Sequence, residues 1–192
     1  MQRLAVSALL LVLSCVSAHS QPFGISEGTP RSAIKIEEEV RPGWLRIVPP
    51  RKHPEFELFH VQITQETGVC RLSAAGITHS NDRYGRSVRS AFQEVREQLE
   101  ATYGKSGLND FLKTGALWKN DEEWVMSIRQ NERIFQAAWG KPSGAPIKNG
   151  VTEVLLNVAA LDQSKSYLRL QFVFSNFDKC ERLRKAGNAS VF

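Results

Sequence analysis

Residues 167–176 alternate strictly between apolar and polar side chains, and this pattern limits the fold more than any other feature of the chain. Successive side chains of a β-strand point to opposite faces, so the alternation predicts a strand with one buried face. Residues 151–161 are apolar on both faces and predict a central strand, joined to the first by a turn over residues 162–166. The inward-facing residues of the alternating strand are Leu168, Leu170, Phe172 and Phe174.

A second hairpin is predicted between residues 56 and 74. Apolar residues again take every second position on either side of a turn over residues 64–68, which is typical of paired strands. Upstream, residues 34–40 alternate weakly, and residues 43–48 fit a short edge strand that ends at two prolines. The alternating apolar residues of the hairpin are Phe59, Val61, Ile63, Cys70, Leu72 and Ala74.

Helices are predicted between the two hairpins and after the second one. Residues 83–103 carry a single apolar stripe and end before Gly104, which fits a helix with a glycine cap. A second helix is predicted from Asn120, where Glu123 completes a capping box, to Gly140. Residues 109–113 fit a short helical turn, and residues 177–185 a short basic helix. The stripe of the first helix consists of Val88, Phe92, Val95, Leu99 and Tyr103, and that of the second of Trp124, Ile128, Phe135 and Ala138.

The order of these elements predicts an α+β fold. Four strands, with residues 43–48 as an optional fifth, form an antiparallel sheet in the order β-β-α-α-β-β-α, and the helices pack on one face of it. The domain spans residues 46–185, which is enough for one hydrophobic core. Residues 19–45 are predicted to be a flexible leader that includes the edge strand, and residues 186–192 a tail.

The first eighteen residues have the layout of a secretory signal peptide. A basic start at Arg3 precedes an apolar run that is too short to cross a bilayer, and Ala18 ends a stretch of small residues. We expect cleavage after Ala18 and an exported protein, either periplasmic or secreted, with no transmembrane segment after processing. Cys15 leaves a second reading open, because the residues around it loosely fit a lipoprotein processing box.

Two cysteines, Cys70 and Cys180, remain after such cleavage. Export into an oxidising compartment favours a disulfide between them over two separate buried thiols. Neither cofactor nor metal is predicted, because the histidines at positions 19, 53, 60 and 79 lack the short spacing of a metal site.

Composition excludes several classes of protein. A hydrophobic fraction of 42% with 23% charged residues excludes a disordered chain, a collagen and a protein of many membrane spans. The net charge of +5 comes with 20 acidic residues, so the basicity is not the dense one-sided kind that predicts nucleic-acid binding.

An enzyme is the less favoured reading. The Gly-x-Ser-x-Gly pattern at residues 24–28 lies in the stretch expected as a flexible leader, and not at the strand-to-helix turn that a nucleophile elbow needs. A thiol dyad of Cys70 with His60 or His79 conflicts with the inward position of Cys70, and Glu122 and Glu123 fit the first turn of a helix better than a catalytic pair. We predict an exported binding or accessory protein of the cell envelope. A hydrolase built from scattered polar residues is the alternative, as is an inhibitor or chaperone-like accessory that uses the loop 141–150.

Arg83, Arg86 and Arg89 are the candidate binding residues. They crowd the start of the first long helix, where the helix dipole disfavours cations, and free backbone N–H groups beside them would complete an anion site. The alternative is an exposed helix face whose long side chains cover apolar surface. The partner then expected is an envelope or extracellular protein or an anionic polymer; the oligomeric state stays undetermined.

Four stretches resemble a group of small uncharacterised bacterial exported proteins, over about residues 48–183. They are TGVC at 67–70, ATYGKS at 101–106, LW...EWVMSIRQNER at 117–133 and FVFSNFDKC at 172–180. The resemblance implies a bacterial source and a single α+β domain. It implies no activity and no functional residues.

Overall fold

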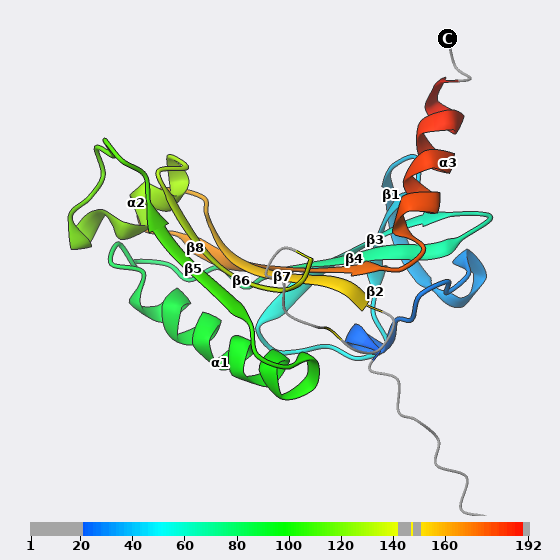
Figure 1. Cartoon of the computed structure of the whole chain (residues 1–192), viewed down its shortest axis with the longest axis horizontal. Coiled ribbons are helices and arrows are strands. Elements are labelled where there is room, and N and C mark those ends of the chain that lie inside the picture. The colour runs from blue at the N-terminus through cyan, green and yellow to red at the C-terminus, as the bar shows by residue number, and fades with distance from the viewer. Residues whose placement is uncertain (1–20, 142–146, 148–150, 190–192) are drawn as a thin grey trace, which may run out of the picture.

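The structure, a computed structural model, describes residues 21–141, 147 and 151–189, and within these residues eight strands form one antiparallel sheet (Figure 1). The expectation of four or five strands is therefore wrong. The predicted combination of helices with an antiparallel sheet is present. The sheet order is β1-β2-β3-β4-β8-β7-β6-β5. The strands are β1 (Lys35–Arg41), β2 (Trp44–Val48), β3 (Phe56–Thr64), β4 (Gly68–Gly76), β5 (Gly107–Leu112), β6 (Arg133–Gly140), β7 (Val151–Ala160) and β8 (Ser166–Phe174).

The sheet consists of two meanders that meet in its middle. Strands β1 to β4 follow one another across one half and β5 to β8 across the other, and β4 pairs with β8 at the seam. Both predicted hairpins are present, as β3–β4 and β7–β8. Leu72 and Phe172 face each other across the seam and lie in the hydrophobic core.

Two segments predicted to be helical are strands. The second helix, α2 (Trp124–Arg129), ends after six residues and not at Gly140, because Asn131 takes a left-handed conformation with φ of 56°. The chain then turns back as β6. Residues 109–113, expected as a helical turn, belong mainly to the edge strand β5. These two corrections and the pairing of β1 and β2 account for the larger sheet.

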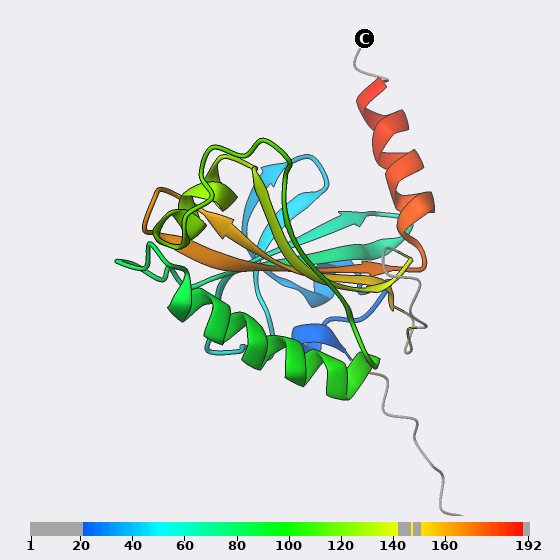
Figure 2. The same ribbon diagram turned by 60° about the vertical axis from the view of Figure 1, so that its left-hand side comes forward.

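Helices cover both faces of the sheet, which corrects the prediction that they pack on one. Helix α1 (Arg86–Tyr103) buries its stripe on the face that carries Phe172, and Tyr103 and Phe172 have ring centroids 5.9 Å apart. Helix α3 (Phe177–Ala189) lies on the opposite face, where it contacts β3 and β4. Figures 1 and 2 show α1 and α3 on opposite sides of the strands.

The described part of the predicted leader belongs to the fold. Ile25 is 2% exposed within the hydrophobic core, and Phe23 packs its ring edge-on against Phe59 at 4.9 Å between centroids. The glycines and prolines that suggested a loose segment form turns, including the 3-10 turns Pro22–Gly24 and Arg31–Ala33, that bring these apolar side chains onto the sheet. Residues 21–45 are thus not simply a flexible leader.

Cys70 and Cys180 form a disulfide that ties α3 to β4, as predicted. Both residues are fully buried. Within the described ranges no helix combines the length and the apolar character needed to cross a bilayer.

Candidate ligand groove at the β1–β2 hairpin

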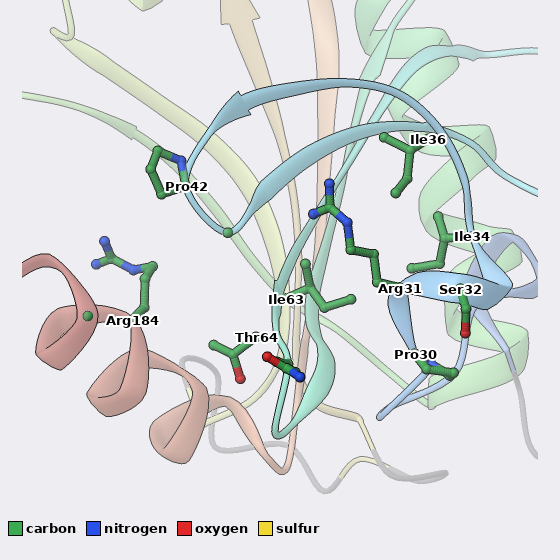
Figure 3. Close-up of a pocket in the computed structure, with 12 residues that line it drawn as sticks. Pro30, Arg31, Ser32, Ile34, Ile36, Pro42, Ile63, Thr64 and Arg184 are labelled. Atoms are coloured by element: carbon green, nitrogen blue, oxygen red, sulfur yellow. The ribbon is translucent and has the colours of Figure 1, made fainter.

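A groove of about 1120 Å³ lies where the β1–β2 hairpin, the end of β3 and helix α3 come together (Figure 3). Ligand pockets in proteins commonly measure ~300–1,000 Å³, so the groove has room for a sizeable ligand. It is lined by Pro30, Arg31, Ser32, Ile34, Ile36, Pro42, Gly43, Ile63, Thr64, Gln65, Arg184 and Gly187.

The floor of the groove is apolar. Figure 3 shows Ile34 and Ile36 on one side of the groove, Pro42 and Arg184 on the other, and Ile63 between them. Ile34 precedes β1 and Ile36 lies in it, so the weak alternation of this segment places both beside the hollow. Ile34 and Ile63 also belong to the hydrophobic core, which makes the floor continuous with the folded interior.

Gly43 sets the shape of the groove at the hairpin turn. Its φ of 74° lies in the left-handed region, and its carbonyl oxygen accepts a hydrogen bond of 3.0 Å from the backbone N–H of Ile63. A β-carbon at this position would come within 3.0 Å of the carbonyl oxygen of Ile63. Glycine therefore lets the turn lie directly against β3.

Two arginines at the groove are each held by a carboxylate. Arg31 pairs with Glu39 at 2.9 Å, and Glu39 also accepts a hydrogen bond from the backbone N–H of Gly43. Arg184 donates two hydrogen bonds to Glu181, of 3.0 and 3.1 Å. These bonds from Arg184, together with one from the side chain of Gln62, lower the pKa of Glu181 from 4.5 to about 2. The ion pair stays formed at neutral pH, which fixes the direction of the Arg184 guanidinium.

The polar side chains of the groove suit binding better than proton transfer. Arginine stays protonated in proteins and offers several N–H donors in a plane. Ser32, Thr64 and Gln65 add further donors and acceptors. The groove can therefore hold an apolar chain on its isoleucines and an anionic group at its guanidinium groups.

The three arginines expected to bind anions lie at the other end of the molecule, near the start of α1, and not in the groove. The backbone N–H groups that the prediction assigned to an anion are taken by Asp82. Its carboxylate accepts hydrogen bonds from Arg86, Ser87 and Val88, at 2.7, 2.8 and 3.1 Å. The protein thus supplies its own anion to this helix end.

The side chains of these arginines are exposed, and two of them stack on aromatic rings. Arg86 lies 4.8 Å from the ring centre of Tyr84, and Arg89 lies 5.5 Å from that of Trp124. Arg83 precedes the helix, and its carbonyl oxygen accepts a hydrogen bond from Val125. Their arrangement resembles the exposed helix face named as the alternative.

Other candidates from the sequence have structural partners. His79 bonds to Glu55 at 2.8 Å, and both side chains are 13% exposed. Cys70 is oxidised in the disulfide, so it offers no thiolate for a dyad. Glu123 closes the predicted capping box with a hydrogen bond from Asn120 at 3.1 Å. Within the described residues no three His, Cys, Asp or Glu side chains gather as metal ligands.

The groove was missed because most of its wall falls in the segment interpreted as a leader. A Pro-Gly pair at 42–43 between two alternating stretches is a recognised turn signal, and it marks the β1–β2 hairpin. The loop 141–150, considered as an inhibitory loop, lies outside the described residues apart from positions 141 and 147, as do the signal segment 1–18 and Cys15.

No family model, curated protein or solved structure matches the chain.

Proposed function

We propose that the chain is an exported binding protein that holds an amphiphilic ligand in the groove at the β1–β2 hairpin. The apolar chain of the ligand lies on the isoleucine floor, and its anionic group meets Arg31 and Arg184. The observation that carries this proposal is the pairing of a large apolar groove with two guanidinium groups at fixed positions.

The energetics favour such a ligand over a purely polar one. Burial of an alkyl chain contributes about 0.8 kcal/mol for each methylene, so a chain along the floor supplies most of the affinity. Hydrogen bonds from charged donors contribute about 1.5–3 kcal/mol each and set the orientation. Glu39 and Glu181 orient the two guanidinium groups, and the ligand bonds to the N–H donors that these carboxylates leave unused.

Export is part of the proposal. The buried Cys70–Cys180 disulfide fits a protein that folds in an oxidising compartment, and the layout of residues 1–18 supports the same route. A periplasmic or secreted binding protein of this kind would act without changing its ligand chemically.

The test compares ligands that share a chain and differ in charge. Isothermal titration with dodecanoate, below its micelle concentration, is expected to give saturable binding, whereas dodecyltrimethylammonium and acetate bind much more weakly. Ile36→Asn and Arg31→Gln should each weaken dodecanoate binding about tenfold.

Matched controls separate the groove from the rest of the surface. Ile77→Asn and Arg83→Gln change an exposed isoleucine and an exposed arginine outside the groove, and both should bind dodecanoate like the parent protein. Equal affinity for the cationic and anionic chains, or equal losses in the controls, would rule out the proposal.

A further inference from the structure

A row of side chains under α3 contains an arginine without a carboxylate partner. Trp44, Gln62 and Arg71 are register neighbours on β2, β3 and β4, so they point to the same face of the sheet. The Arg71 guanidinium lies 4.2 Å from the ring centre of Phe177 and 5.7 Å from that of Trp44. Two aromatic rings therefore hold it in place.

The hydrogen-bonding capacity of Arg71 is largely unused. Its Nε is buried and has no hydrogen-bond partner, and among the described residues no carboxylate lies within ion-pair distance of it. Two acidic groups interact electrostatically with Arg71, namely Glu181 and Glu153. Of these, Glu181 is already bonded to Arg184 and Gln62. Burial lowers the pKa of Arg71. A half-buried cation with free donors is stabilised by an anion brought from outside.

A second arginine shares the same indole ring. Arg41, at the end of β1, has its guanidinium 4.7 Å from the ring centre of Trp44. Its side chain is exposed and, within the described part of the chain, forms no ion pair. Arg41 and Arg71 thus approach one tryptophan from two strands. Their positive charges repel each other at this spacing, and an anion bound between them would offset the repulsion.

We propose that Arg41 and Arg71, positioned by Trp44, form a binding site for a phosphoryl group. A tetrahedral phosphate has enough oxygens to accept hydrogen bonds from two guanidinium groups that come from different directions. The site adjoins the groove, because Glu181 beside Arg71 is bonded to Arg184 of the groove wall, and Pro42 and Gly43 connect Arg41 to Trp44. It does not depend on the function proposed for the groove.

The test is titration of the intact oxidised protein with inorganic phosphate at constant ionic strength. Calorimetry should show saturable binding, and the emission of Trp44 should change because its two cation neighbours move onto the ligand. Arg41→Gln and Arg71→Gln should each weaken phosphate binding about tenfold. Trp44→Phe should remove the fluorescence change.

Controls exclude indirect effects. Arg169→Gln removes an exposed arginine from the same face of the sheet, and it should leave the affinity for phosphate unchanged. Because Arg71 contacts α3, its variant is compared by circular dichroism with the parent protein, while the exposed Arg41 provides a variant without that risk.

A second series of ligands distinguishes a phosphate ester from the free phosphate ion as the ligand. Binding of glycerol 3-phosphate as tightly as phosphate indicates a headgroup or metabolite ester, and binding of phosphate alone indicates the free ion. Acetate bound as well as phosphate, or phosphate affinity unchanged in both arginine variants, would overturn the proposal.

Discussion

The indole ring of Trp124 occupies the space where Gly85 would carry a side chain. A β-carbon on Gly85 would lie 2.1 Å from Cε3 of Trp124, far inside van der Waals contact. Gly85 also has a φ of 67°, in the left-handed region. This contact joins the start of α1 to α2, so both helices depend on the absence of a side chain at one position.

Gly85→Ala should therefore destabilise the protein strongly. We expect a loss of about 3 kcal/mol or more in the free energy of unfolding, from backbone strain and overpacking combined. Gly115→Ala is the matched control, because its φ is 79° and nothing lies within 4 Å of its β-carbon position. It should cost only about 1–2 kcal/mol. Urea unfolding measures both values, and equal losses would contradict the Trp124 contact.

Asp82→Ala should weaken the start of α1. The Asp82 carboxylate caps three backbone N–H groups, and loss of such a cap costs about 1–2 kcal/mol. Asp82→Asn keeps an acceptor oxygen and should lose less. Asp121→Ala removes an exposed acidic residue elsewhere, with an expected change within about 0.5 kcal/mol. If all three variants unfold at the same urea concentration, the cap contributes nothing.

Removal of the disulfide should lower stability by about 3–5 kcal/mol, because the bond closes a long loop in the unfolded chain. The loop runs over a sequence separation of 110. The double variant Cys70→Ala/Cys180→Ala should unfold at a lower urea concentration than the parent. A reductant should lower the unfolding midpoint of the parent and leave that of the variant unchanged. If the parent is fully unfolded with reductant and then still unfolds at its original urea concentration, the result would argue against the bond.

Glu181 should make stability depend on pH in the acid range. Its pKa is lowered from 4.5 to about 2 in the folded protein, chiefly by hydrogen bonds from Arg184. A carboxyl group with a depressed pKa stabilises the fold above its unfolded pKa, and this contribution disappears as the pH falls from about 4.5 to about 2. The melting temperatures of parent and Glu181→Gln should therefore differ most near pH 6 and converge near pH 2. A constant difference would exclude this ion pair as the cause.

Much of the sheet was predictable where alternation is strong. Strands β3, β4 and β8 follow from it directly, whereas β7 follows from a run that is apolar on both faces. Residues 124–139 carry apolar residues at helical spacing, yet the same stretch holds the alternating set Phe135, Ala137 and Trp139 of strand β6. Helical and strand periods overlap in a stretch this short, and only the turn at Asn131 decides between them.

The disulfide could be predicted from the sequence, whereas the groove could not. The Cys70–Cys180 bond follows from the number of cysteines and the expected compartment. The groove arises because a hairpin, the end of β3 and a C-terminal helix meet in space, and no local pattern contains that information. The arginines of α1 were conspicuous in the sequence, but Asp82 lies just before them and already satisfies the helix end.

The seam between β4 and β8 has a consequence for the order in which the chain matures. The first meander ends at Gly76, but its partner strand begins only at Ser166. A chain that folds from its N-terminus must keep the open edge of β4 unpaired until β8 is available, and such edges invite aggregation. Cys180 follows β8, so the native bond to Cys70 closes only once the last strand has arrived. Oxidation of this pair is therefore a marker that the two meanders have joined.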